Sequence, residues 1–453
     1  MPPAVQVRPW QQFSGDPAIW TCAGVGAAAG VLLGPTWQGV LAGAIGATLF
    51  ALARPIVLLT FIIATAGINF QPEFGDAAAI SGTHNLDLNA VRLLGVLLAT
   101  CILVARKAVE RPSLREAVPF LAFPVFGAIS LIWTSDRTEG VRFLAQIAYP
   151  IATLVLTTAT IREGGRHGIW VALIVGSWAS LLVNLSMFLA GASESDAQFF
   201  RYHGTLAPNP LGLFSAASVL TLYGASRWRS TMLTSITCLV MLLQLVATGS
   251  RTSLIALAGA LMLLESLRGR WSRLGLLLLV VGIVWLATPA FIARPGLSLE
   301  PGSTIAAVAG EDNLSGRLFI WYDIWSALIS GAEVVGRGIG SSTAYMAARY
   351  STLRSTHSEF IRLLAETGFV GLALFVGALA RVGWRLARVI RGGSDSDRDA
   401  GRLGLAALAL LTVACLTENA LGGYAYFVAP IFVVVAIGTA SEQTEARRQS
   451  NDT

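Results

Sequence analysis

The sequence has little charge and long stretches with none. Of its 453 residues, 13% are charged and 54% are hydrophobic, whereas a soluble domain carries roughly 25% charged residues. The mean hydropathy is +0.65. The apolar runs are long and do not alternate with polar residues at period two, which favours spanning helices over a β-barrel. The composition therefore excludes a soluble globular protein and predicts an all-α, polytopic membrane helix bundle.

Motifs for metals and nucleotides are missing as well. The four cysteines lie in apolar runs without ligand spacing, so we interpret them as packing residues. There is no HExxH, no Walker loop and no GxSxG elbow. The one DxD pair, Asp395 and Asp397, lies in residues 391–402, which we predict to be a solvated cytoplasmic linker. We expect no cofactor and no metal, and we interpret residues 336–340 (GRGIG) as a turn.

What the sequence does contain is a series of apolar runs, each close to the length of a membrane span. About 20 residues are needed to cross a bilayer, and this length predicts about 12–14 transmembrane helices. The predicted spans centre on residues 18–33, 37–52, 55–68, 91–105, 118–133, 143–159, 168–190, 211–225, 231–247, 253–267, 274–291, 369–380, 403–416 and 424–437.

The distribution of basic residues orients these spans. If the N-terminus is cytoplasmic, most of the 32 basic residues fall in the short loops of the inner side, as the positive-inside rule requires. This explains the net charge of +6 without a nucleic-acid partner. We predict four parts: spans and short loops over 1–292, a large periplasmic loop with short helices over 293–362, C-terminal spans over 363–440 and a polar cytoplasmic tail over 441–453.

Three arginines on the predicted outer side are candidates for binding an anion. Arg251 lies in a tight turn, where Ser250 or Thr252 can cap the next helix and leave backbone N–H groups beside the guanidinium. That arrangement suits phosphate, although contact with lipid headgroups is an equal alternative. Arg201 lies in a polar outer loop, where it is either solvated or bound to a ligand.

Arg317 opens a predicted helix that would lie in the membrane interface. Its apolar face would carry Leu318, Trp321, Trp325, Leu328 and Ile329. Arginine normally favours the last turn of a helix, where it faces the negative end. Binding of an anionic ligand would explain the position of Arg317 in the first turn. We interpret two other arginines, Arg142 and Arg362, as snorkelling from span ends to the interface.

His357 is the candidate general base. The stretch Thr356-His357-Ser358-Glu359 matches a capping box, with Thr356 as N-cap and Glu359 at the third helical position. His357 then falls in the first helical turn, whose positive end disfavours an imidazolium. A neutral imidazole facing a wet cleft can act as a general base. An ordinary exposed histidine is the alternative, and Glu359 is then structural.

These motifs, in this order, resemble the bacterial O-antigen ligase and O-antigen polymerase superfamily. The likeness is carried by Arg201-Tyr202-His203-Gly204 with Pro208-Asn209, by Thr248-Gly249-Ser250-Arg251, by Gly316-Arg317 through Trp321, by residues 336–340 leading to His357, and by Glu366-Thr367-Gly368 through Gly371. It covers residues 201–374 well and the N-terminal half by hydropathy alone. Similar sequences often have asparagine after the histidine, where this chain has Ser358.

The resemblance implies a GT-C-type glycosyltransferase of the bacterial inner membrane, with its active site facing the periplasm. It implies undecaprenyl-diphosphate-linked glycan as donor, and a glycan or lipid hydroxyl as acceptor. His357 would act on the acceptor, Arg251 and Arg317 would hold the diphosphate, and Arg201 is a weaker match for that role. A transporter or flippase of a lipid-linked oligosaccharide is the alternative, which predicts ionisable residues in mid-span. The outer loop is richer in such residues than the spans, which favours the enzyme.

Overall fold

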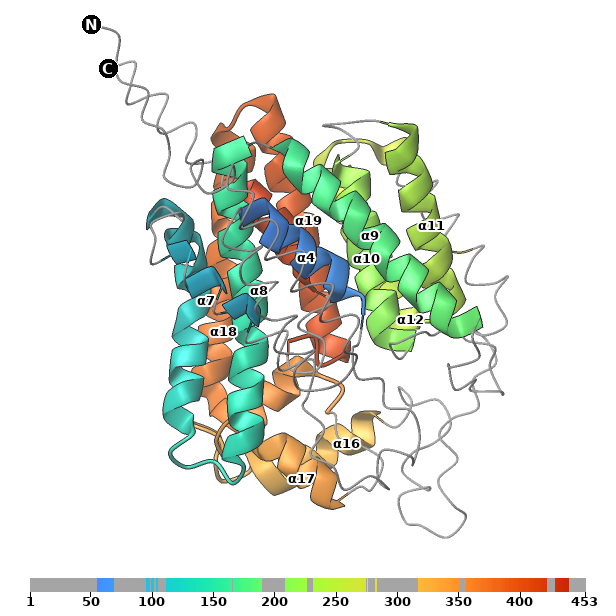
Figure 1. The fold of residues 1–453 in the computed structure, drawn as a ribbon. Coiled ribbons are helices and arrows are strands. Elements are labelled where there is room, and N and C mark those ends of the chain that lie inside the picture. Colours follow the sequence, from blue (N-terminus) through green and yellow to red (C-terminus); the bar gives the residue numbers. More distant parts are fainter. Residues whose placement is uncertain are drawn as a thin grey trace, which may run out of the picture.

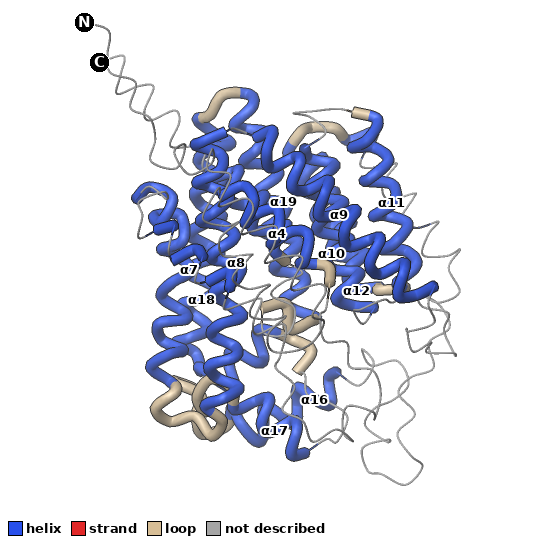
Figure 2. Tube along the Cα trace, in the orientation of Figure 1, coloured by secondary structure: helices blue, strands red, loops and turns tan. Residues whose placement is uncertain are grey.

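The computed structural model is helical throughout the part it describes, namely residues 55–68, 111–164, 166–189, 208–225, 231–273, 317–349, 356–421 and 428–439, with isolated positions in 95–104 and at 275 and 282. No strand occurs in these ranges (Figures 1 and 2). The predicted all-α fold class is therefore confirmed.

The longer helices form a bundle, and the shorter ones gather at one end of it (Figure 1). The bundle helices are α4 (Pro55–Ala66), α7 (Arg111–Ser130), α8 (Arg137–Gly164), α9 (Arg166–Leu189), α10 (Pro208–Ala225), α11 (Met232–Thr248), α12 (Arg251–Leu267), α18 (Glu359–Gly392), α19 (Asp395–Thr417) and the helix Ala429–Thr439. The short helices are α16 (Arg317–Ile324), the π-helix η2 (Trp325–Ile329) and α17 (Ser341–Arg349).

Four described helices are long and apolar enough to cross a membrane: Arg137–Ile161, Gly168–Ser186, Glu359–Gly392 and Asp395–Thr417. Shorter apolar helices, such as Met232–Thr248, accompany them. The chain is thus a polytopic helical membrane protein. The predicted spans 18–33 and 37–52, and nearly all of 274–291, lie outside the described residues. The number of 12–14 spans therefore stays a prediction.

Two predicted connections differ from the structure. Residues 391–402 are helical on both sides of Gly393 and Ser394 and do not form a linker, because α18 extends to Gly392 and α19 begins at Asp395. The predicted solvation is confirmed for residues 391–396, nearly all of which are exposed. The polar residues of this interval form the N-terminus of α19. Ser394 is its N-cap, and the Ser394 side chain accepts from the N–H of Asp397. In addition, α18 begins at Glu359, so the predicted loop 293–362 and the C-terminal part from 363 meet inside one helix.

α18 is broken at Gly368, whose φ of 62° and ψ of −165° are accessible to glycine alone. The loop from Glu333 to Gly338 replaces the lost helical hydrogen bonds. The N–H groups of Arg337 and Gly338 donate to the carbonyls of Ala365 (2.9 Å) and Glu366 (2.8 Å). After the break, the N–H groups of Phe369 and Val370 donate to the carbonyls of Glu333 (2.7 Å) and Val334 (3.1 Å).

The predicted turn at 336–340 is confirmed, and the break in α18 explains its glycines. Gly336, Gly338 and Gly340 all have positive φ. A Cβ on Gly336 would overlap the carbonyl of Glu366, so the loop can approach the broken helix only without a side chain there.

At the opposite end of the bundle, an ionic cluster joins α12 to α19. Arg268 donates from Nε and Nη2 to the two carboxylate oxygens of Asp399, at 2.8 and 2.9 Å, and from Nη1 to Glu265 at 2.8 Å. Its side chain is 3% exposed. The two carboxylates offset the charge of the buried arginine, and Arg270 lies 3.9 Å from Glu265. The cluster therefore fixes the end of α12 against the start of α19.

Gly368→Ala is expected to lower the Tm of the purified protein in detergent by roughly 5 °C, because alanine is strained at this φ and ψ and its Cβ would overlap Val334. Gly377→Ala is the matched control. Gly377 lies in the same helix with open space around it, so alanine should leave the Tm unchanged or raise it slightly. Equal Tm values for Gly368→Ala and the wild type would contradict this account of the break.

Asp399→Asn is expected to lower the free energy of unfolding by about 2–3 kcal/mol, because it removes the bidentate partner of a buried arginine. Asp395→Asn is the control, since its pair with Arg398 is exposed and should contribute about 0–0.5 kcal/mol. Thermal unfolding of both variants measures the difference. Similar losses in the two variants would show that burial of the cluster has no energetic consequence.

Candidate functional site

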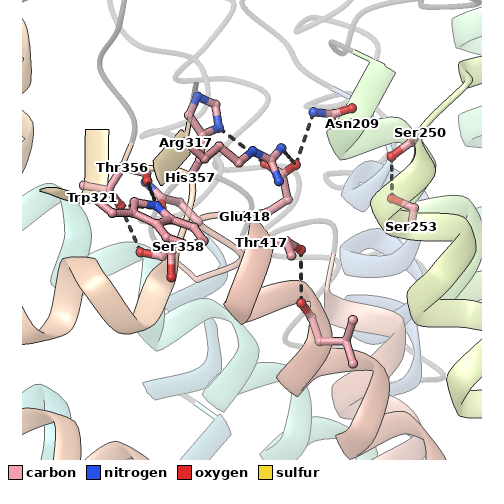
Figure 3. A network of polar contacts seen from close by, with 12 residues as sticks. Asn209, Ser250, Ser253, Arg317, Trp321, Thr356, His357, Ser358, Thr417 and Glu418 are labelled. Atoms are coloured by element: carbon pink, nitrogen blue, oxygen red, sulfur yellow. Dashed lines mark hydrogen bonds and ion pairs between the residues drawn. The ribbon is translucent and has the colours of Figure 1, made fainter. Parts of the chain in front are cut away.

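Arg317, His357 and Glu418 meet at the end of the bundle where the short helices gather (Figures 1 and 3). Arg317 is the first residue of α16, His357 immediately precedes the N-cap of α18, and Glu418 follows the last residue of α19. Arg317 Nη2 lies 2.8 Å from Glu418 Oε1, and His357 Nδ1 lies 3.7 Å from Glu418 Oε2. The structure thus brings two of the predicted residues to one carboxylate.

The predicted capping box at 356–359 is wrong. Ser358 is the N-cap of α18 and accepts from the N–H of Ile361 at 3.5 Å, so Glu359 is the first helical residue. Thr356 Oγ1 donates to Asn419 Oδ1 at 2.8 Å, and Glu359 Oε2 accepts from the N–H of Leu421 at 3.1 Å. Thr356 and Glu359 therefore bind the segment that follows α19 instead of each other's backbone.

His357 lies outside the helix, not in its first turn as predicted. Its φ of 53° makes it the single non-glycine residue with positive φ among those described. This left-handed conformation costs on the order of 1 kcal/mol and persists where surrounding contacts enforce it. Here the contacts of Thr356 and Glu359 on either side hold the chain in this turn. His357 is therefore not in the first helical turn, and the carboxylate of Glu418 faces its ring.

Residues 418–421 are held against the start of α18 by backbone as well as side chains. The N–H of Glu359 donates to the carbonyl of Glu418 at 3.2 Å. Trp321 Nε1 donates to the carbonyl of Thr356 at 2.9 Å, which ties α16 to the same segment. Three elements distant in sequence thus share one set of hydrogen bonds, and the position of Glu418 is fixed by its backbone.

α16 begins at Arg317 as predicted, and the placement of its apolar face in the membrane interface stays a prediction. Ile320, Ile324 and Ile329 are buried, while Leu318 and Trp325 are exposed. The π-turn at η2 changes the spacing of side chains after Ile324, which a regular helical pattern cannot anticipate. The first-turn arginine does face an anion, and in this structure that anion is Glu418 of the chain itself.

Arg251 is the first residue of α12, and the tight turn predicted before it is present. Gly249 ends α11 in the left-handed conformation, and Ser250 occupies the N-cap position of α12. Ser250 Oγ bonds to Ser253 Oγ at 2.9 Å and caps no helical N–H. The predicted capping position is thus confirmed, whereas its side-chain bond is absent.

The turn before Arg251 lies beside the helix that reaches Glu418. Ser250 packs against Gly212 of α10, where no Cβ could be accommodated. One turn earlier on α10, Asn209 Nδ2 donates to Glu418 Oε1 at 3.2 Å. Figure 3 shows Ser250 and Asn209 on the same side of Glu418. Arg201, the fourth candidate, lies outside the described residues.

Arg362 does not snorkel to the interface, contrary to the prediction. It is buried, its Nε lies 3.3 Å from Glu366 Oε1, and its guanidinium lies 3.6 Å from the ring centroid of Phe143. Ser342 Oγ donates to the same Glu366 oxygen at 2.6 Å. This pair holds α17 and α8 against the first part of α18, so Arg362 has a structural role.

Sequence reasoning missed Glu418 and gave Asn209 no role of its own. Glu418 lies between two predicted spans, on the side that the arginine distribution assigned to His357. A lone carboxylate at that position was the available signal. Its pairing with Arg317 joins residues 101 positions apart, and nothing in the sequence indicates that distance.

The site offers a basic nitrogen, cations and a buried carboxylate. An arginine at a helix start can stabilise a phosphate, and a histidine beside a carboxylate can accept a proton. In the ranges that the structure describes, no three His, Cys, Asp or Glu side chains form a group that could hold a metal ion.

The family model described as O-antigen ligase matches residues 236–376. The match runs from α11 into α18, so it includes Arg251, Arg317 and His357 and ends before Glu418. Over these residues the chain is similar to the O-antigen ligase family, and the predicted resemblance to the O-antigen ligase and polymerase superfamily is confirmed. The match indicates a membrane enzyme of the ligase or polymerase type. A search of curated proteins found no match.

Proposed function

We propose that this protein transfers a glycan from undecaprenyl diphosphate to the hydroxyl of a glycan or lipid acceptor. The observation that carries the proposal is the meeting of His357 and Arg317 at the buried Glu418. The arginine distribution supports a site on the periplasmic face of the bacterial inner membrane. A GT-C-type architecture fits a helical bundle with short helices at one end.

In the proposed reaction, His357 takes the proton of the acceptor hydroxyl as the oxygen attacks the anomeric carbon. The bond from that carbon to the diphosphate oxygen breaks, and its electron pair leaves on the diphosphate. Arg251 and Arg317 stabilise the charge that develops there, with Arg201 as a further contact. Because diphosphate is a good leaving group, no acid and no metal are required.

The buried charges of the described helices favour the enzyme over the alternative of a transporter. The Arg268 cluster lies where α12 ends and α19 begins, and the Arg362–Glu366 pair lies near the start of α18. Each of these charges has a fixed partner within the protein. A pathway for a sugar or ion instead requires ionisable groups in mid-span, facing a cavity.

His357→Ala is expected to abolish glycan transfer by purified protein supplied with undecaprenyl-diphosphate glycan and acceptor, in EDTA and without added metal. Arg251→Ala and Arg317→Ala should each lower kcat/KM roughly 30-fold, the equivalent of about 2 kcal/mol for a charged hydrogen bond left unmade. Gel electrophoresis of the product and thermal unfolding of each variant are the measurements.

Arg381→Ala and His167→Ala are the matched controls. Arg381 is exposed on α18 well beyond its break, and His167 lies at the start of α9. Both variants should keep wild-type activity. Full transfer by folded His357→Ala would remove the proposed base.

The product is expected to have the opposite anomeric configuration to the donor, because a single displacement without an enzyme nucleophile inverts the carbon. NMR assignment of the new linkage, compared with that of the donor, measures this. A retained configuration would mean a two-step reaction and would contradict the proposed mechanism.

A further inference from the structure

The two oxygens of the Glu418 carboxylate have different surroundings. Oε1 accepts from Arg317 at 2.8 Å and from Asn209 at 3.2 Å. Oε2 is buried and has no hydrogen-bond partner within the described residues, while His357 Nδ1 lies 3.7 Å away. A buried carboxylate oxygen without a donor is unfavourable and requires an explanation.

The backbone of Glu418 is held by hydrogen bonds on both sides, while its side chain has rotatable bonds. The N–H of Glu418 donates to the carbonyl of Ala414 at 2.8 Å, and its carbonyl accepts from Glu359. On the next residue, Asn419 binds Thr356. Closing the gap from 3.7 Å to a hydrogen bond of about 2.8 Å requires a carboxylate displacement of only about 1 Å. A rotation of the side chain supplies that displacement once Oε1 is released.

Arg317 holds Oε1 in this structure, and it is also the arginine we assign to the diphosphate. A diphosphate carries more negative charge than a carboxylate and offers several oxygens to one guanidinium. A donor that enters the site therefore competes with Glu418 for Arg317. Loss of that contact leaves the charge of the carboxylate without its arginine partner, and His357 Nδ1 lies 3.7 Å from its second oxygen.

We propose that Glu418 is a positioning residue that holds Arg317 while the donor is absent and turns to His357 when the diphosphate takes Arg317. In the second state, Glu418 accepts the N–H at Nδ1 and fixes the tautomer of His357. Nε2 is then the nitrogen that takes the acceptor proton, and the carboxylate stabilises the resulting imidazolium. Binding of the donor thus places His357 in the tautomer that can accept a proton at Nε2. This inference rests on the proposed function.

The exchange predicts opposite effects on binding and turnover. Glu418 competes with the donor, so removing its charge should tighten donor binding. It also orients His357, so the same change should slow the chemical step. A residue with a purely structural role would weaken both.

The test compares Glu418→Gln with Glu265→Gln in the full-length purified protein. Undecaprenyl diphosphate is the probe for the dissociation constant, measured by tryptophan fluorescence, and transfer assays give kcat. For Glu418→Gln we expect a Kd lower by roughly 3- to 10-fold and a kcat lower by about 100-fold or more. Glu265→Gln neutralises another buried carboxylate, at the opposite end of the bundle, and keeps an oxygen for Arg268, so both constants should stay near wild type.

A second background isolates the role of Arg317. In Arg317→Ala, the further change Glu418→Gln should no longer alter the Kd, because the competition acts through that arginine alone. Glu418→Asp keeps the charge and should retain more kcat than Glu418→Gln, which also serves if the glutamine variant unfolds.

A Kd that is unchanged or raised in Glu418→Gln would overturn the exchange, as would an unchanged kcat. Failure of this inference differs from failure of the proposed function. If the wild type transfers glycan and His357→Ala does not, the proposed function holds. Wild-type Kd and kcat values in Glu418→Gln would then reject only the proposed role of Glu418. If the wild type neither binds undecaprenyl diphosphate nor transfers glycan, both proposals are wrong.

Discussion

A buried carboxylate at the end of α19 is the constraint on which the candidate site depends. Glu418 is 2% exposed, and an ionised carboxylate stays in such surroundings only where donors surround it. Arg317 and Asn209 supply those donors from the starts of α16 and α10. The requirement to neutralise one charge thus brings together segments that the chain order keeps apart, and His357 is placed beside the same charge.

The break in α18 also helps to position the candidate site. A membrane helix can be interrupted where other protein groups take over its backbone hydrogen bonds, and the loop from Glu333 to Gly338 does this at Gly368. The residues between Ser358 and Gly368 consequently form a short helix of their own, fixed at its start by the segment after α19 and at its end by the glycine loop. His357 is held at the first of these fixed points.

The sequence predicted the features that depend on local composition: the all-helical class, the turn rich in glycine and the helix that opens at Arg317. It failed where distant partners decide. Thr356 and Glu359 have the spacing of a capping box, but in the folded chain they bond to Asn419 and Leu421. Glu418 was missed for the same reason, because a carboxylate in a short connection has no sequence pattern that reveals an arginine 101 residues away.

α19 carries a paired carboxylate near each end, Asp399 bound to Arg268 and Glu418 bound to Arg317. An α-helix advances about 1.5 Å and turns about 100° per residue. Insertion or deletion of one residue between these two positions would therefore turn one carboxylate away from its arginine while the other stayed in place. The number of residues in α19 is as strict a requirement as the identity of its end residues, and the helix should accept changes of apolar side chain far more readily than changes of length.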